Sequence, residues 1–202
     1  MTRRLAQLLL GLYLYGAAMA LMVRSGLGLD PWDVFHQGLA GRVGLSIGLL
    51  VNIVGALVLL LWIPLRQKPG IGTIANVLVI GTSMDLTMLL LPEVAGLPAR
   101  VAALVVAIGI NGLAGAMYIG AGLGPGPRDG LMTGIARRTG WSIRLVRTGI
   151  ELTVLASGWL LGGTVGVGTV LYAFAIGPIV QAFLPALTVR DTATQETSAV
   201  NP

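Results

Sequence analysis

The chain contains no cysteine and only one histidine among its 202 residues, and just 10% of the residues are charged. Without cysteine there can be no disulfide, no thiol nucleophile and no Cys-ligated metal. The single histidine, His36, has no evident partner in the sequence, so we expect no metal site, no cofactor and no enzyme. A soluble domain carries about a quarter charged residues, and this chain lacks the polar side chains to cover such a surface.

Hydrophobic residues and glycine are abundant instead. They supply 55% of the chain and 30 residues respectively, and the mean hydropathy is +0.87. This composition is typical of an all-α membrane protein, in which small residues let helices approach closely. The formal charge of +5 is spread singly between apolar runs, which favours a role in membrane topology over nucleic-acid binding.

Six apolar runs reach the roughly 17 to 25 residues that a helix needs to cross a bilayer. They are 5–23, 46–65, 73–91, 101–118, 142–161 and 169–187. Positive charges concentrate on the cytoplasmic side of bacterial membrane proteins, and one orientation gives a clear bias. It places both termini in the cytoplasm, with eight basic residues there: Arg3, Arg4, Arg66, Lys68, Arg128, Arg137, Arg138 and Arg190. We expect the tail 188–202 to be disordered.

The sequence repeats itself at a shift of 96 positions, without a gap. Over 26–81 and 122–177, about 20 of roughly 56 positions are identical. The markers that stay in register are Gly26-Leu27-Gly28 with Gly122-Leu123-Gly124, Pro31 with Pro127, Asp33 with Asp129, Gly70 to Thr73 with Gly166 to Thr169, and Gly81 with Gly177. Shared composition alone would not preserve such a register.

Each half of the repeat holds three predicted spans, and three is odd. The halves, 1–92 and 93–187, are therefore expected to enter the membrane from opposite sides. Inverted repeats of this kind recur in secondary transporters, with the site near the pseudo-two-fold axis. The fold class predicted from the sequence is thus six transmembrane helices in two inverted three-helix repeats, each with a short helix after its first span.

Four segments resemble the YczE/YyaS/YitT family of bacterial multi-span membrane proteins. They are 26–33, 69–73, 122–130 with its Gly-Pro-Arg-Asp-Gly run, and 161–169. The likeness covers nearly the whole chain apart from the tail, and is nearest to the shorter YczE type because no cytosolic domain follows the membrane part. It implies a multi-pass protein of the bacterial inner membrane and supplies no substrate.

Two Pro-x-Asp elements should each begin a short helix, over 31–42 and 127–138. Pro31 and Pro127 suit the first helical turn, and Asp33 and Asp129 would lie near the positive helix end. About a dozen residues are too few to span a bilayer. These helices are either re-entrant, with N-termini directed at a solute near the midplane, or capped connectors lying at the membrane surface, and Arg128 is a further candidate residue of the second element.

The two Gly-x-Gly-Thr elements indicate tight turns that precede a span. We expect Thr73 and Thr169 to act as the N-caps of the helices that follow. Glycine at these turns also lets backbone amides approach another group closely. No lysine of a phosphate-binding loop accompanies them, so a nucleotide site is not indicated.

Ionisable residues inside predicted spans are costly and therefore candidates for function. Asp85 lies within the third span, and Arg144, Arg147 and Glu151 share one face of the fifth. Two interpretations remain open for them. Arg147 could form a structural ion pair with Glu151 or Asp85, or the group could bind a solute and carry protons.

The leading hypothesis for function is transport of a small polar or charged solute by alternating access, coupled in one version to protons. Its partners would be the lipid bilayer, the solute and, as an option, a second copy of the chain. A passive channel is the first alternative. The second is a membrane subunit or assembly factor that binds a ligand or partner without transporting anything.

Overall fold

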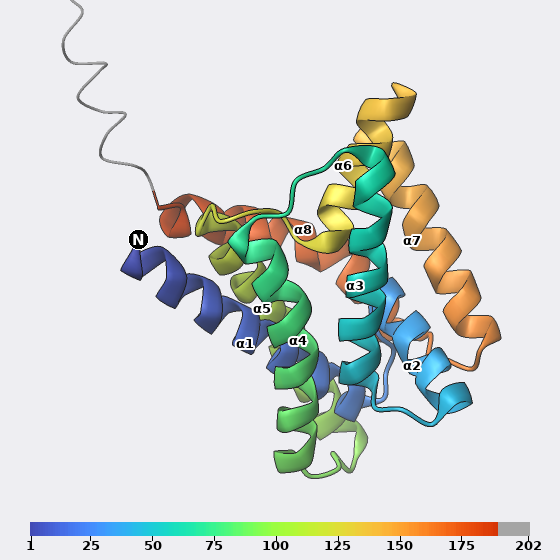
Figure 1. Ribbon diagram of the computed structural model, residues 1–202. Helices are drawn as coiled ribbons and strands as arrows, with labels where there is room; N and C mark the ends of the chain where they lie inside the picture. The colour runs from blue at the N-terminus through green and yellow to red at the C-terminus, as the bar shows by residue number, and fades with distance from the viewer. Residues whose placement is uncertain (190–202) are drawn as a thin grey trace, which may run out of the picture.

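The computed structural model describes residues 1–189, and within them all regular structure is helical (Figure 1). The first half of the described chain contains α1 (Thr2–Ser25), α2 (Pro31–Val43), α3 (Ile47–Leu65) and α4 (Ile71–Leu90). The second half contains α5 (Leu97–Gly120), α6 (Pro127–Thr139), α7 (Ile143–Leu160) and α8 (Val167–Leu187). Most of the predicted disordered tail, 190–202, lies outside the described residues.

Five of these helices, α1, α3, α4, α5 and α8, are long and apolar enough to cross a membrane. The prediction of six spans is met only in part. The run 142–161 does form a helix, α7, but it has 18 residues and three of them are charged. Charged side chains are expensive in a bilayer core, which sets α7 apart from the other five.

The two short helices are present where the Pro-x-Asp elements predicted them. Both α2 and α6 have 13 residues and carry proline in the first turn. Each ends at a glycine in the left-handed conformation, Gly44 with φ 72° and Gly140 with φ 76°. A residue with a Cβ is strained there, so glycine stops each helix at this point.

The bundle is organised around α1 and α5, which pack along each other at its centre. Helix α4 packs on α1, and α8 packs on α5. The short helices cross between the halves of the chain, because α2 packs mainly on α7 and α6 mainly on α3. Figure 1 shows that α2 and α6 begin near the middle of the bundle and run toward its opposite ends.

The threonines of the Gly-x-Gly-Thr elements are not N-caps, contrary to the sequence prediction. Helices α4 and α8 start earlier, with Gly70 and Gly166 at the N-cap positions. Thr73 and Thr169 lie one turn inside, where each hydroxyl accepts a hydrogen bond from the N-cap N–H, at 3.1 and 3.2 Å. The threonine hydroxyl gives the N-cap N–H a hydrogen-bond partner that it would otherwise lack, so the helix can begin at the glycine.

The extended segments that lead into the short helices α2 and α6 pack against these glycine turns. The N–H of Gly72 donates to the carbonyl of Leu123 at 2.8 Å, and the N–H of Gly168 donates to Leu27 at the same distance. Gly28 has φ 117°, and a Cβ there would lie 2.7 Å from the nitrogen of Gly166. Only glycine permits this approach between backbones, which fixes where each extended segment runs.

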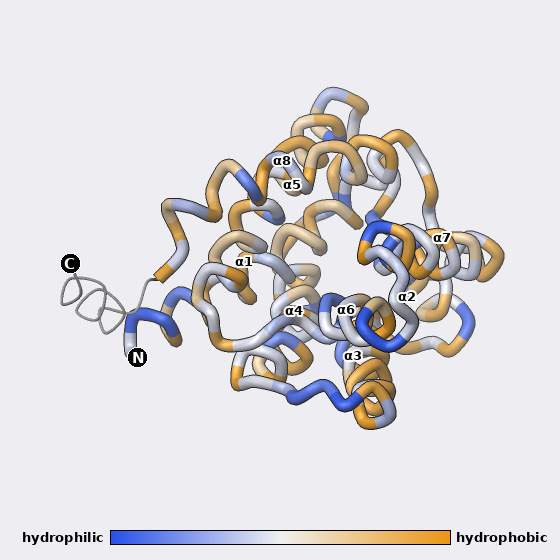
Figure 2. The backbone as a smooth tube through the Cα atoms, turned by 90° about the horizontal axis from the view of Figure 1, so that it is seen from above, coloured by the Kyte–Doolittle hydropathy of each residue, from blue (hydrophilic) through white to orange (hydrophobic). Residues whose placement is uncertain are grey.

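The outer faces of the helices are apolar. Figure 2 shows hydrophobic residues along the outside of α3, α7 and α8. Leu89, Leu90 and Phe174 are each about four-fifths exposed, at 82%, 80% and 79%. Such a surface is incompatible with water over a large area, and the spanning helices therefore contact the lipid bilayer.

Replacing Thr73 by valine should destabilise the protein more than the same change at Thr169. The hydroxyl of Thr73 also donates to the carbonyl of Pro125 at 2.7 Å, and its residue is fully buried. We expect Thr73→Val to cost about 1–3 kcal/mol, since it leaves buried polar groups unpaired. Thermal unfolding in detergent measures both variants, and equal losses would contradict the additional role of Thr73.

Candidate functional site

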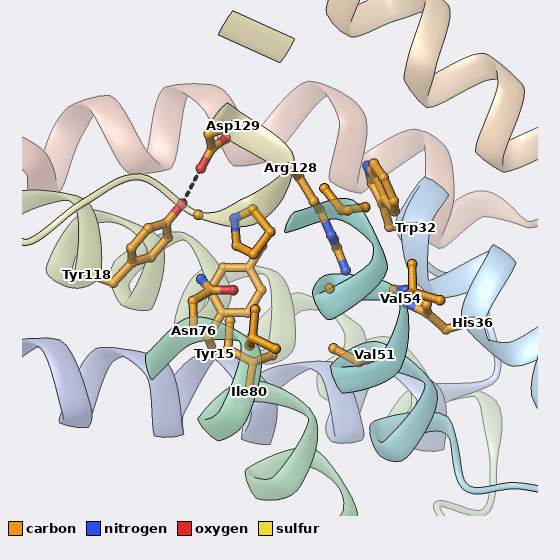
Figure 3. Close-up of a pocket in the computed structure, with 15 residues that line it drawn as sticks. Tyr15, Trp32, His36, Val51, Val54, Asn76, Ile80, Tyr118, Arg128 and Asp129 are labelled. Carbon is orange, nitrogen blue, oxygen red and sulfur yellow. Dashed lines mark hydrogen bonds between the residues drawn. The ribbon is translucent and has the colours of Figure 1, made fainter. Parts of the chain in front are cut away.

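A cavity of about 80 Å³ lies inside the bundle where α1, α2, α3, α4, α5 and α6 converge (Figure 3). A buried water needs about 10–15 Å³ on this measure, so the space suits several waters or a small solute. Its polar and aromatic lining is Tyr15, Trp32, His36, Asn76, Tyr118, Arg128 and Asp129. Valine, isoleucine, glycine and Pro127 supply the rest.

The N-termini of α2 and α6 face each other beside this cavity. Arg128, in the first turn of α6, approaches Asp30 at 3.9 Å and Asp33 at 4.0 Å on α2. Its guanidinium also lies 4.8 Å from the centre of the Trp32 ring. These distances exceed the length of a hydrogen bond, so charge attraction and the aromatic ring hold the side chain. Figure 3 shows it extending into the cavity from α6.

The two aspartates of α2 have different tasks. Asp30 is the N-cap, and its Oδ1 accepts from the N–H groups of Trp32 and Asp33 at 3.0 and 3.3 Å. Asp33 is fully buried and its Oδ1 lies 3.1 Å from Nδ1 of His36, which is 1% exposed. The expectation that His36 has no partner is therefore wrong.

Three buried polar atoms at this point have no hydrogen-bond partner within residues 1–189. They are Oδ2 of Asp33, Nε2 of His36 and Nε1 of Trp32. A buried polar atom left unpaired costs about 1–3 kcal/mol. Because Trp32 and His36 also line the cavity, a molecule bound there can supply the missing partners.

Two contacts fix the start of α6. The Tyr118 hydroxyl donates to Oδ2 of Asp129 at 2.6 Å, drawn as a dashed line in Figure 3. The indole of Trp62, on α3, donates to the carbonyl of Pro127 at 3.0 Å. The same indole lies against Gly130, where a Cβ would overlap its ring. Arg128 is thus aimed by contacts from α3 and α5.

The residues of the sequence motifs gather around this cavity. Pro127, Arg128 and Asp129 line it, Asp33 lies behind His36, and Pro31 begins the helix that carries both. Thr73 and Thr169 hold the glycine turns that place α4 and α8.

Asp85 is placed elsewhere, at the N-terminus of α3. Its Oδ1 accepts from the N–H of Gly48 at 2.9 Å, and its Oδ2 accepts from the hydroxyl of Ser46 at 2.5 Å and the N–H of Leu49 at 3.1 Å. A carboxylate at a helix N-terminus is favourable. This contact ties α4 to α3.

The charged group of α7 stays on its own helix. Arg147 pairs with Glu151 at 2.8 Å, and their side chains are 56% and 32% exposed. Arg144 is exposed one turn earlier. None of the three lines the cavity, and Asp85 finds its partners on α3 instead of α7.

The sequence offered a weak signal for one part of the site. Asp33 and His36 are three residues apart on a predicted helix, a spacing that brings side chains together. Tyr15, Asn76 and Tyr118 gave no comparable signal, because they reach the cavity from α1, α4 and α5.

This fold and site define a multi-span helical membrane protein with a polar cavity inside. Residues 2–185 match the model of a protein family of unknown function, DUF6198, and the chain belongs to that family. It is 41% identical over 177 residues to an uncharacterized protein of Haemophilus influenzae, covering 88% of this chain and 81% of that one.

Two Bacillus subtilis proteins are also similar. The uncharacterized membrane protein YczE is 36% identical over 87% of this chain and 82% of its own. The uncharacterized protein YyaS is 24% identical over 87% and 90%. The resemblance to the YczE and YyaS proteins is thereby confirmed. No solved structure matches the chain.

The contact between Gly130 and Trp62 provides a test of how α6 is positioned. Gly130→Ala should destabilise the protein by about 1–3 kcal/mol, since the added methyl overlaps the indole. Trp62→Phe removes the overlapping ring and should make Gly130→Ala less costly. A double-mutant cycle measured by thermal unfolding checks this coupling, and strict additivity would contradict it.

Proposed function

We propose that the protein transports a small polar or charged solute across the bacterial inner membrane by alternating access. The observation that carries this proposal is a difference between equivalent helix pairs. Helices α3 and α4 are packed together, whereas their counterparts at a shift of 96, α7 and α8, are apart. A transporter built from two like halves has such a difference whenever one side is closed.

The α3–α4 contact is a closed gate. The backbones of Gly48 and Gly81 touch so closely that neither position has room for a Cβ. Asp85 adds its bonds to the start of α3, and the Asn52 amide donates to the Thr82 hydroxyl at 3.1 Å. No space remains for a solute to pass between these helices at this end of the bundle.

The equivalent positions on α7 and α8 are open. Gly177, the counterpart of Gly81, has no atom within 4 Å of an added Cβ. Arg144 and Gln181, the counterparts of Gly48 and Asp85, are both exposed. Helix α7 packs on α2 and α6 rather than on α8.

The rest of the topology follows from this proposal. Helix α7 is the sixth span, and the ion pair between Arg147 and Glu151 lowers the cost of placing its charges in the membrane. The two halves are inverted. With both termini in the cytoplasm, the gate at Asp85 closes the outer end, and the gap at Arg144 opens inward. A passive channel would need a continuous path, which the packed α3–α4 gate interrupts.

The α7 charges acquire a role in the second state. Arg147 and Glu151 correspond to Val51 and Gly55, which line the cavity from α3. If α7 closes on α8 as α3 closes on α4, Arg147 and Glu151 turn toward the solute path. They are then candidates for solute contact or coupling in that state.

Binding should depend on Arg128. A ligand found by screening a metabolite library for thermal stabilisation should add about 2.7 kcal/mol at a hundred times its dissociation constant. Arg128→Gln should change that stabilisation and the uptake of the same ligand into proteoliposomes, with binding weakened for an anionic ligand and strengthened for a cationic one. Lys68→Gln, at an exposed residue outside the cavity lining, is the matched control. Unchanged uptake by Arg128→Gln would reject the site.

Paired cysteines test the two gates, since the chain has no cysteine of its own. Asn52→Cys with Thr82→Cys should react readily with a short thiol crosslinker and block uptake. The equivalent pair, Thr148→Cys with Pro178→Cys, should react slowly without ligand and faster when ligand drives the opposite state. Equal reactivity of both pairs under all conditions would favour a static protein over alternating access.

A further inference from the structure

The buried cluster beside the cavity contains more negative than positive charge. Asp30, Asp33 and Asp129 supply three carboxylates against the one guanidinium of Arg128. The two helix N-termini contribute about half an elementary charge each, which leaves about one negative charge unbalanced. An unpaired charge inside a membrane protein is costly, so the site favours one further positive charge, either as a bound cation or as a proton on one of its own titratable groups.

His36 can carry that charge as a proton. An ionised carboxylate only accepts hydrogen bonds, so the Asp33 contact assigns the imidazole proton to Nδ1, 3.1 Å from Oδ1. The lone pair is then on Nε2, which has no partner in the described chain, on a side chain that lines the cavity. Histidine is the side chain that changes charge near neutral pH.

Opposing influences act on a positive charge at His36. Burial away from water disfavours the charge, and so does Arg128 on α6, whereas Asp30 favours it and Asp33 lies 3.1 Å from Nδ1. The phenols of Tyr15 and Tyr172 approach the same aspartates from α1 and α8. Helices α3 and α7 pack apolar side chains around Trp32, among them Val54 and Val154.

A second way to supply the charge is a cationic solute. Tyr15, Trp32 and Tyr118 line the cavity with aromatic rings, which attract organic cations. Arg128 already shows the chemistry, because its guanidinium lies over Trp32 and near two carboxylates without a hydrogen bond to either. Within residues 1–189 no three His, Asp or Glu side chains converge as metal ligands would, which favours an organic cation.

We propose that a proton on His36 and a small organic ammonium or guanidinium cation compete for the carboxylates of this cavity. The inference rests on the proposed transport function and specifies it as exchange of one proton for one cation. In one state a proton passes from cavity water to Nε2, while Nδ1–H stays bonded to Asp33. When the cation enters, the proton returns to water, so the charge of the site is the same in both states.

The only histidine of the chain makes a direct test feasible. Protein labelled with ¹⁵N-histidine and purified without a histidine tag gives imidazole signals from His36 alone. Its protonation is followed by NMR against pH, with methylammonium, guanidinium or tetramethylammonium chloride at low millimolar concentration, and with sodium chloride and sodium acetate as matched salts.

The competing cation should lower the pH at which His36 is half protonated. Linkage requires a fall of about one pH unit at ten times the dissociation constant of the cation. Sodium acetate at equal ionic strength should leave the midpoint in place. No shift with any of the three cations overturns the proposal, and so does a rise with acetate, which would instead mean that an anion binds together with the proton.

Two variants and a flux assay distinguish a failure of this proposal from a failure of the proposed transport function. Asp33→Asn should remove the competition, while Glu93→Gln, at an exposed loop residue, should preserve it. Proteoliposomes with an internal pH dye then report proton movement driven by a gradient of the same cations. If the cations compete with the proton but no protons cross the membrane, the exchange site is supported and transport is rejected. Proton movement with a His36 that does not titrate retains transport and rejects His36 as the proton carrier.

Discussion

The N-termini of α2 and α6 meet inside the bundle, and much of the structure is arranged around that meeting. A helix end inside a membrane leaves backbone N–H groups without water, so the polar groups that satisfy them must come from the protein. Asp30 does this for α2, and Asp129 brings a carboxylate to the first turn of α6. The charges of Asp30 and Asp33 in turn hold Arg128 between the helices. The polar cavity is a consequence of starting two helices at this depth.

Reaching that depth requires the glycine turns. After α1 and after α5 the chain must return into the bundle in an extended form, beside the N-termini of α8 and α4. The close approach of Gly28 to Gly166, and of Gly124 to Gly70, leaves no room for side chains. The threonines Thr73 and Thr169 complete each turn from inside the helix. The repeated glycines and threonines thus build the scaffold, and they are the positions that remain alike in the two halves.

Most polar and aromatic residues of the cavity lie at positions where the two halves differ. At a shift of 96, Trp32 corresponds to Arg128 and His36 to Met132. The aromatic ring and the cation of the Trp32–Arg128 contact therefore come from the same position of the repeat. Asp30 corresponds to Gly126, so α2 is capped by a side chain and α6 is not. Equivalent positions of the sequence repeat meet at this contact, and divergence between them produces a pair that neither half could form alone.

Because the site forms between the two halves of the chain, only its local features could be predicted from the sequence. The short helices follow from local signals, proline in the first turn and glycine after the last, and their bounds agree with the prediction to within one residue. The pair Arg147–Glu151 is also local, four residues apart on one helix. The contact of Arg128 with Asp33 is not local, because it joins residues nearly a hundred positions apart. Sequence patterns identified both residues as candidates, but only the packing of α2 and α6 shows that they belong to one site.

The same divergence makes the two proposed gates unequal. Asp85 holds the start of α3 with a charge that the helix N-terminus attracts, whereas its counterpart Gln181 is neutral, and α7 has Arg144 where α3 has Gly48. An amide gains less than a carboxylate from a helix N-terminus, and an arginine side chain is bulkier than Gly48 at the closest contact. The α3–α4 gate is therefore the more stable when closed. Under alternating access, the empty protein rests in this state, and the energy for opening the α3–α4 gate must come from what binds in the cavity.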